Sequence, residues 1–327
     1  MTKNLKVFLA TAVGSVSIWW GLNALSEGLT NFFAAQHMQN DPHLAAASAS
    51  QLALEQKLQS IYPRARIGAS PLNIGAQAAL SLYVTKEGEP RTLFQKNSAA
   101  PVPIASLTKL MTALVAIKNY TPNQHIVITQ EILATPGEAG QLQEGDIFPV
   151  KDLLYLSLME SSNDAATALA EPNGQEWFVH QMNEEATRLN LQDTQFINTT
   201  GLDGAEQSNV STAEDLALLT RYVFSTHPQV FDILSQRELP LRTPEGRFHH
   251  LMRNTNELLG YYDWPARILG GKTGTTPRAR QALLFVVESP DRSGYVINII
   301  LGSEARFSEM RSLLRWILET YEWEMPL

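Results

Sequence analysis

Two strongly apolar segments near the C-terminal end of the chain limit its fold more than any other feature. Residues 282–289 and 295–302 consist mainly of aliphatic and aromatic side chains, and each has the length of a buried strand. Residues 290–294 between them include Pro, Asp and Gly, which favour a tight turn. The two segments are therefore predicted to pair as an antiparallel hairpin.

A second hairpin is predicted at the other end of the same region, where residues 78–84 and 91–97 flank a turn rich in charged residues and Gly. Helical patterns fill most of the chain between the hairpins. They cover residues 104–117, 150–160, 164–171, 174–191 and 215–224, and a last helix is expected at 304–323. Strands at both ends with helices between them predict one α+β domain, with an antiparallel sheet flanked by helices.

Composition excludes several classes of function. The 327 residues include no cysteine, so thiol nucleophiles, thiolate metal sites and disulfides are excluded. Lys and Arg number 25 against 33 Asp and Glu, a formal net charge of -8. That balance argues against a nucleic-acid partner, which requires a basic surface to contact phosphate.

The N-terminal segment predicts the compartment. Residues 7–26 carry no charge, follow Lys3 and Lys6, and would span about 30 Å as a helix. The positive charges before this segment favour an N-terminus on the cytoplasmic side, with the chain after Ser26 on the outer side of the membrane. We expect residues 1–26 to be a membrane anchor, 27–70 a polar stalk or linker, and 71–327 an extracytoplasmic domain. A cleaved signal peptide is the alternative, and it would make the protein secreted.

Common catalytic motifs are absent from the sequence. There is no G-x-S-x-G elbow, no P-loop, no Rossmann glycine pattern and no HExxH. His249 and His250 form the one adjacent histidine pair, and neighbouring side chains on a regular element point apart. No metal site is expected there, and no cofactor is predicted.

Ser106 and Lys109 provide a nucleophile that needs no histidine. Residues three apart share a helix face, so the Lys109 amine can reach the Ser106 hydroxyl. Lys109 lies within an apolar run, and desolvation there lowers the pKa of an amine toward the range of a general base. The alternative is a helix N-terminus that carries an ordinary surface lysine.

Two further polar segments could complete such a site. Ser161, Ser162 and Asn163 interrupt two helical patterns, where a hydroxyl and an amide could relay a proton and bind a carbonyl, or could simply cap a helix. Lys272, Thr273 and Gly274, followed by Thr275, could form a strand edge that holds a peptide carboxylate, or a glycine-rich turn.

In this order, Ser106-x-x-Lys109, Ser161-x-Asn163 and Lys272-Thr273-Gly274 resemble the three motifs of penicillin-binding proteins and serine β-lactamases. Three further segments narrow the resemblance to the D-alanyl-D-alanine carboxypeptidases: residues 161–171, 197–204 and 254–259. The resemblance extends over roughly residues 75–320. This resemblance implies the penicillin-binding-protein fold, in which an all-helical subdomain lies beside the sheet.

The resemblance also implies a role for each motif residue. Ser106 would attack the penultimate D-alanine carbonyl of a peptidoglycan stem pentapeptide, with Lys109 as general base. Ser161 and Asn163 would pass the proton to the leaving D-alanine and hold the substrate, and Lys272 would tune the electrostatics. Thr273 would bind the terminal carboxylate beside Gly274, and the N–H groups of Ser106 and Thr275 would form the oxyanion hole. β-Lactam antibiotics would be covalent inhibitors.

Several alternatives share these motifs. A β-lactamase would need a deacylating glutamate, and Glu171 follows the second motif too closely and in the wrong context. An endopeptidase, a transpeptidase and a non-enzymatic β-lactam or wall sensor also remain. The family usually has a small Ala-Gly pair after the third motif, whereas here Arg280 follows Ala279 in the place of the glycine. The roles of Arg278 and Arg280 are open, as is the oligomeric state.

Overall fold

The structure is a computed structural model that describes residues 62–68, 70–137, 139–260 and 263–323. The predicted anchor at 1–26 and most of the predicted stalk lie outside these residues. No helix in the described ranges is both long and apolar enough to cross a bilayer. The compact unit begins at Pro63. Its first strand, β1 (Arg64–Ala65), pairs with β13 (Tyr321–Glu322), so the last part of the expected linker belongs to the folded unit.

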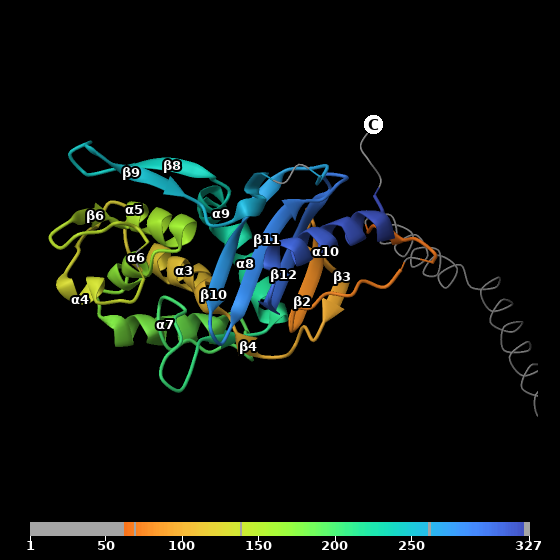
Figure 1. Cartoon of the computed structure of the whole chain (residues 1–327), viewed down its shortest axis with the longest axis horizontal. Coiled ribbons are helices and arrows are strands. Elements are labelled where there is room, and N and C mark those ends of the chain that lie inside the picture. Colours follow the sequence, from red (N-terminus) through yellow and green to blue (C-terminus); the bar gives the residue numbers. More distant parts are fainter. Residues whose placement is uncertain (1–61, 69, 138, 261–262, 324–327) are drawn as a thin grey trace, which may run out of the picture. The chain divides into compact units, whose positions relative to one another are not determined.

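A five-stranded antiparallel sheet forms the centre of the fold (Figure 1). Both predicted hairpins are present and lie next to each other in it. The strands are, in spatial order, β10 (Ile268–Thr276), β11 (Arg280–Glu288), β12 (Gly294–Ser303), β2 (Ala78–Thr85) and β3 (Pro90–Lys96). In chain order, β2 is the first strand of this sheet and β12 is the last, and the two are paired, with Val296 opposite Tyr83. This pairing brings residues more than two hundred positions apart together and leaves β10 on an edge.

Helices cover both faces of the sheet (Figure 1). α10 (Arg306–Thr320) buries apolar residues at the spacing of one helix face, which are Met310, Leu313, Leu314 and Ile317. It packs against β11 and β12. α8 (Ala213–Thr226) packs against β2 and β12 from the side of the main apolar core. Complete burial of each such aliphatic side chain contributes about 1.5–3 kcal/mol, so the two helices stabilise the sheet from both faces.

The second part of the fold is mainly helical. It contains α3 (Lys109–Asn119), α4 (Gln130–Leu133), α5 (Val150–Tyr155), the π-helix η2 (Leu156–Glu160), α6 (Asn163–Ala168) and α7 (Gln175–Arg188). The prediction of an all-helical subdomain is wrong in one respect, because β5 (His125–Val127) and β6 (Ile147–Pro149) pair within it. These strands are three residues each, too short to show a strand period.

The remaining elements connect the two parts. They are β4 (Val102–Pro103), the 3-10 helix η1 (Ala105–Thr108), β7 (Val210–Ser211), α9 (Gln229–Leu234), β8 (Glu238–Arg242), β9 (Phe248–Arg253) and the 3-10 helix η3 (Glu257–Gly260). β8 and β9 form a hairpin above the helical part (Figure 1). Thr212 is the N-cap of α8, and its side-chain hydroxyl accepts from the N–H of Asp215.

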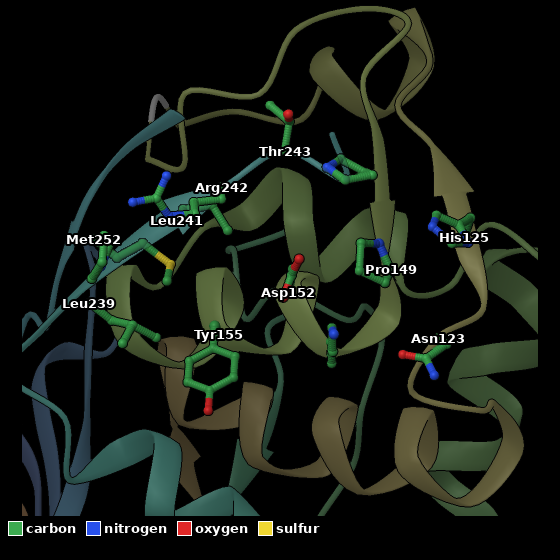
Figure 2. A pocket seen from close by; sticks show the side chains of 13 residues that line it. Asn123, His125, Pro149, Asp152, Tyr155, Leu239, Leu241, Arg242, Thr243 and Met252 are labelled. Carbon is green, nitrogen blue, oxygen red and sulfur yellow. The ribbon is translucent and has the colours of Figure 1, made fainter. Parts of the chain in front are cut away.

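A cavity of about 640 Å³ separates the β8–β9 hairpin from α5. Figure 2 shows Leu239 and Met252 of the hairpin on one side of this space, and Asp152 and Tyr155 of α5 on another. None of the residues of the three motifs lines it. The hairpin is therefore not packed continuously against α5.

Candidate active site

The first motif lies where η1 passes into α3. Ser106 is half-buried in η1, and Lys109, the first residue of α3, is completely buried. Lys109 Nζ lies 2.9 Å from Ser106 Oγ, so the predicted contact between residues three apart is present. Ala105 precedes the serine with a φ of 47°, a left-handed conformation that costs about 1 kcal/mol or more in a non-glycine residue.

The other two neighbours of Lys109 decide what its amine does. Nζ donates to Asn163 Oδ1 at 2.7 Å and to the carbonyl oxygen of Thr200 at 2.8 Å. Both oxygens are acceptors only, and the Asn163 amide is oriented because its Nδ2 donates to the carbonyl of Pro136. A neutral amine has two N–H groups, which these acceptors use. Its lone pair is then left for Ser106 Oγ, the one neighbour that can donate.

Burial lowers the pKa of Lys109 well below its ordinary value, and the nearby charge of Lys272 lowers it further. Deprotonation of this amine at neutral pH is what a general base for a serine requires. The alternative of a surface lysine at a helix end is wrong, because no part of Lys109 is exposed.

The second motif lies at the junction of η2 and α6. Ser161 ends η2 in the left-handed conformation, with φ 62°. Ser162 has a different function, since its hydroxyl accepts from the N–H of Ala165 and caps α6. The capping interpretation is therefore correct for Ser162, while Ser161 and Asn163 face the other two motifs through Lys272 and Lys109.

The third motif lies on β10, the edge strand of the sheet. Lys272 is buried, and its Nζ donates to Ser161 Oγ at 2.8 Å. Burial, and then the neighbouring charge of Arg306, lower the pKa of Lys272 to about 7. Thr273 Oγ1 shares a 2.6 Å hydrogen bond with Thr255 Oγ1. The structure thus brings all three motifs together, and the glycine-rich-turn alternative for 272–274 is wrong.

Two glycines, Gly201 and Gly274, allow neighbouring backbone segments to lie close to the backbone of Ala105 and Ser106. A Cβ on Gly274 would lie 3.0 Å from the Ser106 nitrogen, and one on Gly201 would lie 2.0 Å from the Ala105 oxygen. Gly201 also has φ +88°, which side chains rarely adopt. Gly274 brings β10 against the Ser106 N–H, the position that the predicted oxyanion hole requires.

Substituting Gly201 by alanine is expected to lower both stability and activity. The new Cβ would displace Ala105 and Ser106, and the cost of positive φ and overpacking together is about 3 kcal/mol. Gly88→Ala is the matched control, because Gly88 has φ +91° and no atom within 4 Å of its Cβ position. Urea unfolding and penicillin acylation rates would measure both effects. Equal behaviour of the two variants would contradict the close approach.

Sequence reasoning missed several contributors to the site. Arg306, at the start of α10, donates to Gly274 O and Thr275 Oγ1. Thr200 and Thr255 lie in the segments 197–204 and 254–259, which resemble the family, but no sequence pattern marked either residue individually. Arg306 carries no local signal at all, since it follows the third motif by more than thirty residues and reaches it only because α10 packs on the sheet.

The two arginines after the third motif have separate structural partners. Arg278 donates from its backbone N–H to Asp203 and from its guanidinium to the carbonyl of Ala205. Arg280, the first residue of β11, has φ 55° and forms an exposed ion pair with Glu304. In the described part of the chain, no group of three or more His, Asp or Glu side chains is arranged to hold a metal ion.

Comparison with known proteins identifies the family. Residues 67–305 match the family D-alanyl-D-alanine carboxypeptidase (peptidase S11). The chain belongs to this family. It is thus a serine hydrolase, and the relationship inferred from the three motifs is confirmed.

Relatives within the family differ in activity and length. The chain is 32% identical to a D-alanyl-D-alanine endopeptidase of Pseudomonas aeruginosa over 73% of this chain and 77% of the relative. It is 35% identical to the D-alanyl-D-alanine carboxypeptidase DacD of Escherichia coli over 65% of this chain, but spans only 56% of that protein. Penicillin-binding protein D2 of Listeria monocytogenes, solved with cefotaxime, superposes with TM-score 0.65 at 30% identity, covering 76% of this chain and 99% of that one. The penicillin-binding-protein fold is therefore confirmed.

Proposed function

We propose that this protein is a serine-type D-Ala-D-Ala carboxypeptidase that removes the terminal D-alanine from peptidoglycan stem pentapeptides through an acyl-enzyme on Ser106. The observation that carries the proposal is the completely buried Lys109 amine, whose lowered pKa and 2.9 Å approach to Ser106 Oγ supply a general base. Its two other neighbours accept hydrogen bonds, which directs the lone pair toward the serine hydroxyl.

The steps of the proposed reaction can be assigned to the residues of this site. Lys109 takes the hydroxyl proton as Ser106 Oγ attacks the carbonyl carbon of the penultimate residue. The Ser106 and Thr275 N–H groups stabilise the oxyanion. Ser161, hydrogen-bonded to Lys272, gives its hydroxyl proton to the departing D-alanine nitrogen as the amide bond breaks, and it regains a proton from Lys109, so that the proton removed from Ser106 ends on the leaving amine. Water then attacks the ester and regenerates Ser106.

The edge position of β10 supports a peptide substrate. Its outer side has no neighbouring strand in the five-stranded sheet, so an extended stem peptide can pair along it. Lys272, Arg306 and Thr273 gather positive charge and a hydroxyl at that strand, which suits a terminal carboxylate. No cofactor takes part in this mechanism.

Product analysis on purified stem peptides tests the proposal. We expect release of D-alanine from a diacetyl-Lys-D-Ala-D-Ala peptide and from pentapeptide stems, with cross-linked dimers left intact. Cleavage of cross-links alone would favour the endopeptidase activity named for the Pseudomonas relative. Formation of new cross-links would favour a transpeptidase, and no turnover of any substrate would favour a sensor.

β-Lactams are expected to acylate Ser106 and remain bound. The Listeria relative has been solved in cefotaxime- and ampicillin-bound forms, at TM-scores of 0.65 and 0.63. Glu171, which follows the second motif, is exposed and lies after the end of α6. Fluorescent penicillin should persist after a wash, whereas rapid loss of the label would indicate a β-lactamase.

We infer from residues 1–26 that the enzyme acts outside the cytoplasmic membrane, where its substrate is located. The support is the uncharged segment at 7–26 after Lys3 and Lys6. Full-length protein should sediment with membranes, and protease added to spheroplasts should digest the catalytic domain. A truncation that lacks 1–26 should remain in the cytoplasm. Recovery of the full-length protein in the cytosol would contradict this location.

A further inference from the structure

The residue directly before Ser161 is tied to the β8–β9 hairpin by a buried polar contact. Glu160 Oε2 lies 2.9 Å from His250 Nε2, and Glu160 Oε1 accepts from the Arg253 N–H at 3.3 Å. The side chains of His250 and Glu160 are only 7% and 14% exposed. A carboxylate accepts hydrogen bonds and does not donate them, so His250 must carry its proton on Nε2.

The second imidazole in this contact comes from an irregularity in β9. His250 pairs with Leu241 and Phe248 pairs with Arg242, so His249 is the extra residue of a β-bulge. The expectation that the two histidines point apart is therefore wrong, because the bulge turns both rings together. Their Nδ1 atoms are 2.7 Å apart.

One proton lies between these two nitrogens, which determines the tautomers. With the His250 proton placed on Nε2, its Nδ1 accepts from the Nδ1–H of His249. His249 is itself placed by the edge of the Phe148 ring and lies 3.9 Å from Asp146 Oδ2. His249 thus holds His250 in the orientation that presents Nε2–H to Glu160.

The position of Ser161 depends on how η2 ends. Its N–H and that of Ser162 both donate to the carbonyl of Leu156, and the carbonyl of Met159 accepts from Thr255. The left-handed φ of Ser161 costs about 1 kcal/mol or more and must be held by its surroundings. β9 packs against η2, and the contact of His250 with Glu160 is a buried polar link between the hairpin and this turn.

We propose that His250 is a positioning residue for the second motif: through Glu160 it fixes the end of η2, and with it the distance between Ser161 Oγ and Lys272 Nζ. This inference rests on the proposed function, in which Ser161 hands a proton to the leaving group. His250 itself touches none of the three motifs.

Three substitutions in the full-length protein test the proposal. His250→Phe keeps a ring and removes the N–H, His250→Gln keeps a donor at a similar reach, and His180→Gln changes an exposed histidine on α7 as the control. The readouts are the rate constant of acylation by fluorescent penicillin at saturation, the dissociation constant of the initial complex, and the fraction of protein that is finally labelled.

We expect His250→Phe to slow acylation about tenfold or more, because a displaced proton donor is costly even when binding is intact. The dissociation constant should stay within about twofold and labelling should still reach completion, since folded sites remain. His250→Gln should recover most of the rate, and His180→Gln should match the wild type. Recovery by Gln separates positioning from general loss of structure.

Two results would overturn the inference. One is an unchanged acylation rate in His250→Phe, and the other is a defect in His250→Gln as large as that in His250→Phe. Failure of the proposed function would look different, since wild-type protein and the His180 control would then be labelled normally but release no D-alanine from the diacetyl-Lys-D-Ala-D-Ala peptide.

Discussion

Replacing Ser106 by alanine is expected to abolish both D-alanine release and covalent labelling by penicillin. The hydroxyl is the bond-forming atom of the proposed acyl-enzyme, and loss of a serine nucleophile lowers turnover by about 10⁴-fold or more. Intact-protein mass spectrometry after penicillin treatment should show the adduct in the wild type and none in Ser106→Ala. An adduct of unchanged size in the variant would place the nucleophile elsewhere.

The Ser106→Ala protein should remain folded, because the rest of the Lys109 network survives. Lys109 keeps its hydrogen bonds to Asn163 and to the Thr200 carbonyl. Ser312→Ala, on the exposed side of α10, is the matched control and should retain full activity. Noncovalent binding of a D-Ala-D-Ala peptide to Ser106→Ala, measured by calorimetry, would show that the site persists without its nucleophile.

Replacing Lys109 by methionine is expected to slow acylation by about 10³-fold while leaving the fold intact. The substitution removes the general base, whose contribution is about 10²–10⁴ in rate, but fills nearly the same volume. Lys86→Met, at an exposed lysine in the β2–β3 turn, should leave the rate unchanged. Acylation by Lys109→Met at the wild-type rate would exclude this lysine as the base.

The same variant should have a different dependence of stability on pH. Burial lowers the pKa of Lys109 in the folded protein, so between that pKa and about 10.5 the unfolded chain binds a proton that the folded chain does not. The free energy of unfolding therefore rises with pH across this window, and falls as pH decreases. Lys272, with a pKa of about 7, contributes in the same direction.

Urea unfolding at pH 7 and pH 9 measures this difference. Wild-type protein should gain stability between the two values, and Lys109→Met should gain less, because only Lys272 then contributes. At pH 7 the variant should be at least as stable as the wild type, since a desolvated amine has been replaced by an apolar side chain. An identical pH slope in both proteins would mean that Lys109 is not deprotonated on folding.

Local patterns were sufficient where a contact is made within a few residues. The turn residues at 290–294 and the apolar runs beside them predicted β11 and β12, and the helical pattern at 304–323 predicted α10. The Ser106–Lys109 contact is of the same kind, because one turn of helix places the two side chains together. The order of the three motifs, together with the segments 161–171, 197–204 and 254–259, was also enough to recognise the family.

Contacts between segments far apart in the sequence could not be predicted from local patterns. The bulge at His249 is set by the register of β8 against β9, and the β5–β6 pair is too short to have a period. Arg306 reaches Gly274 only because α10 packs across the sheet. Each of these depends on where a distant segment lies, which side-chain periodicity does not encode.

The sequence by itself determined which residues could do the chemistry: a hydroxyl and an amine one helical turn apart, and two further polar segments in a characteristic order. Only the tertiary structure decided the surroundings that suit this amine to act as a base. Lys109 loses contact with water, and meets Asn163 and the Thr200 carbonyl, because segments 54 and 91 residues away fold over it. Desolvation and acceptor placement depend on the three-dimensional surroundings of a group, and those exist only once the chain has folded.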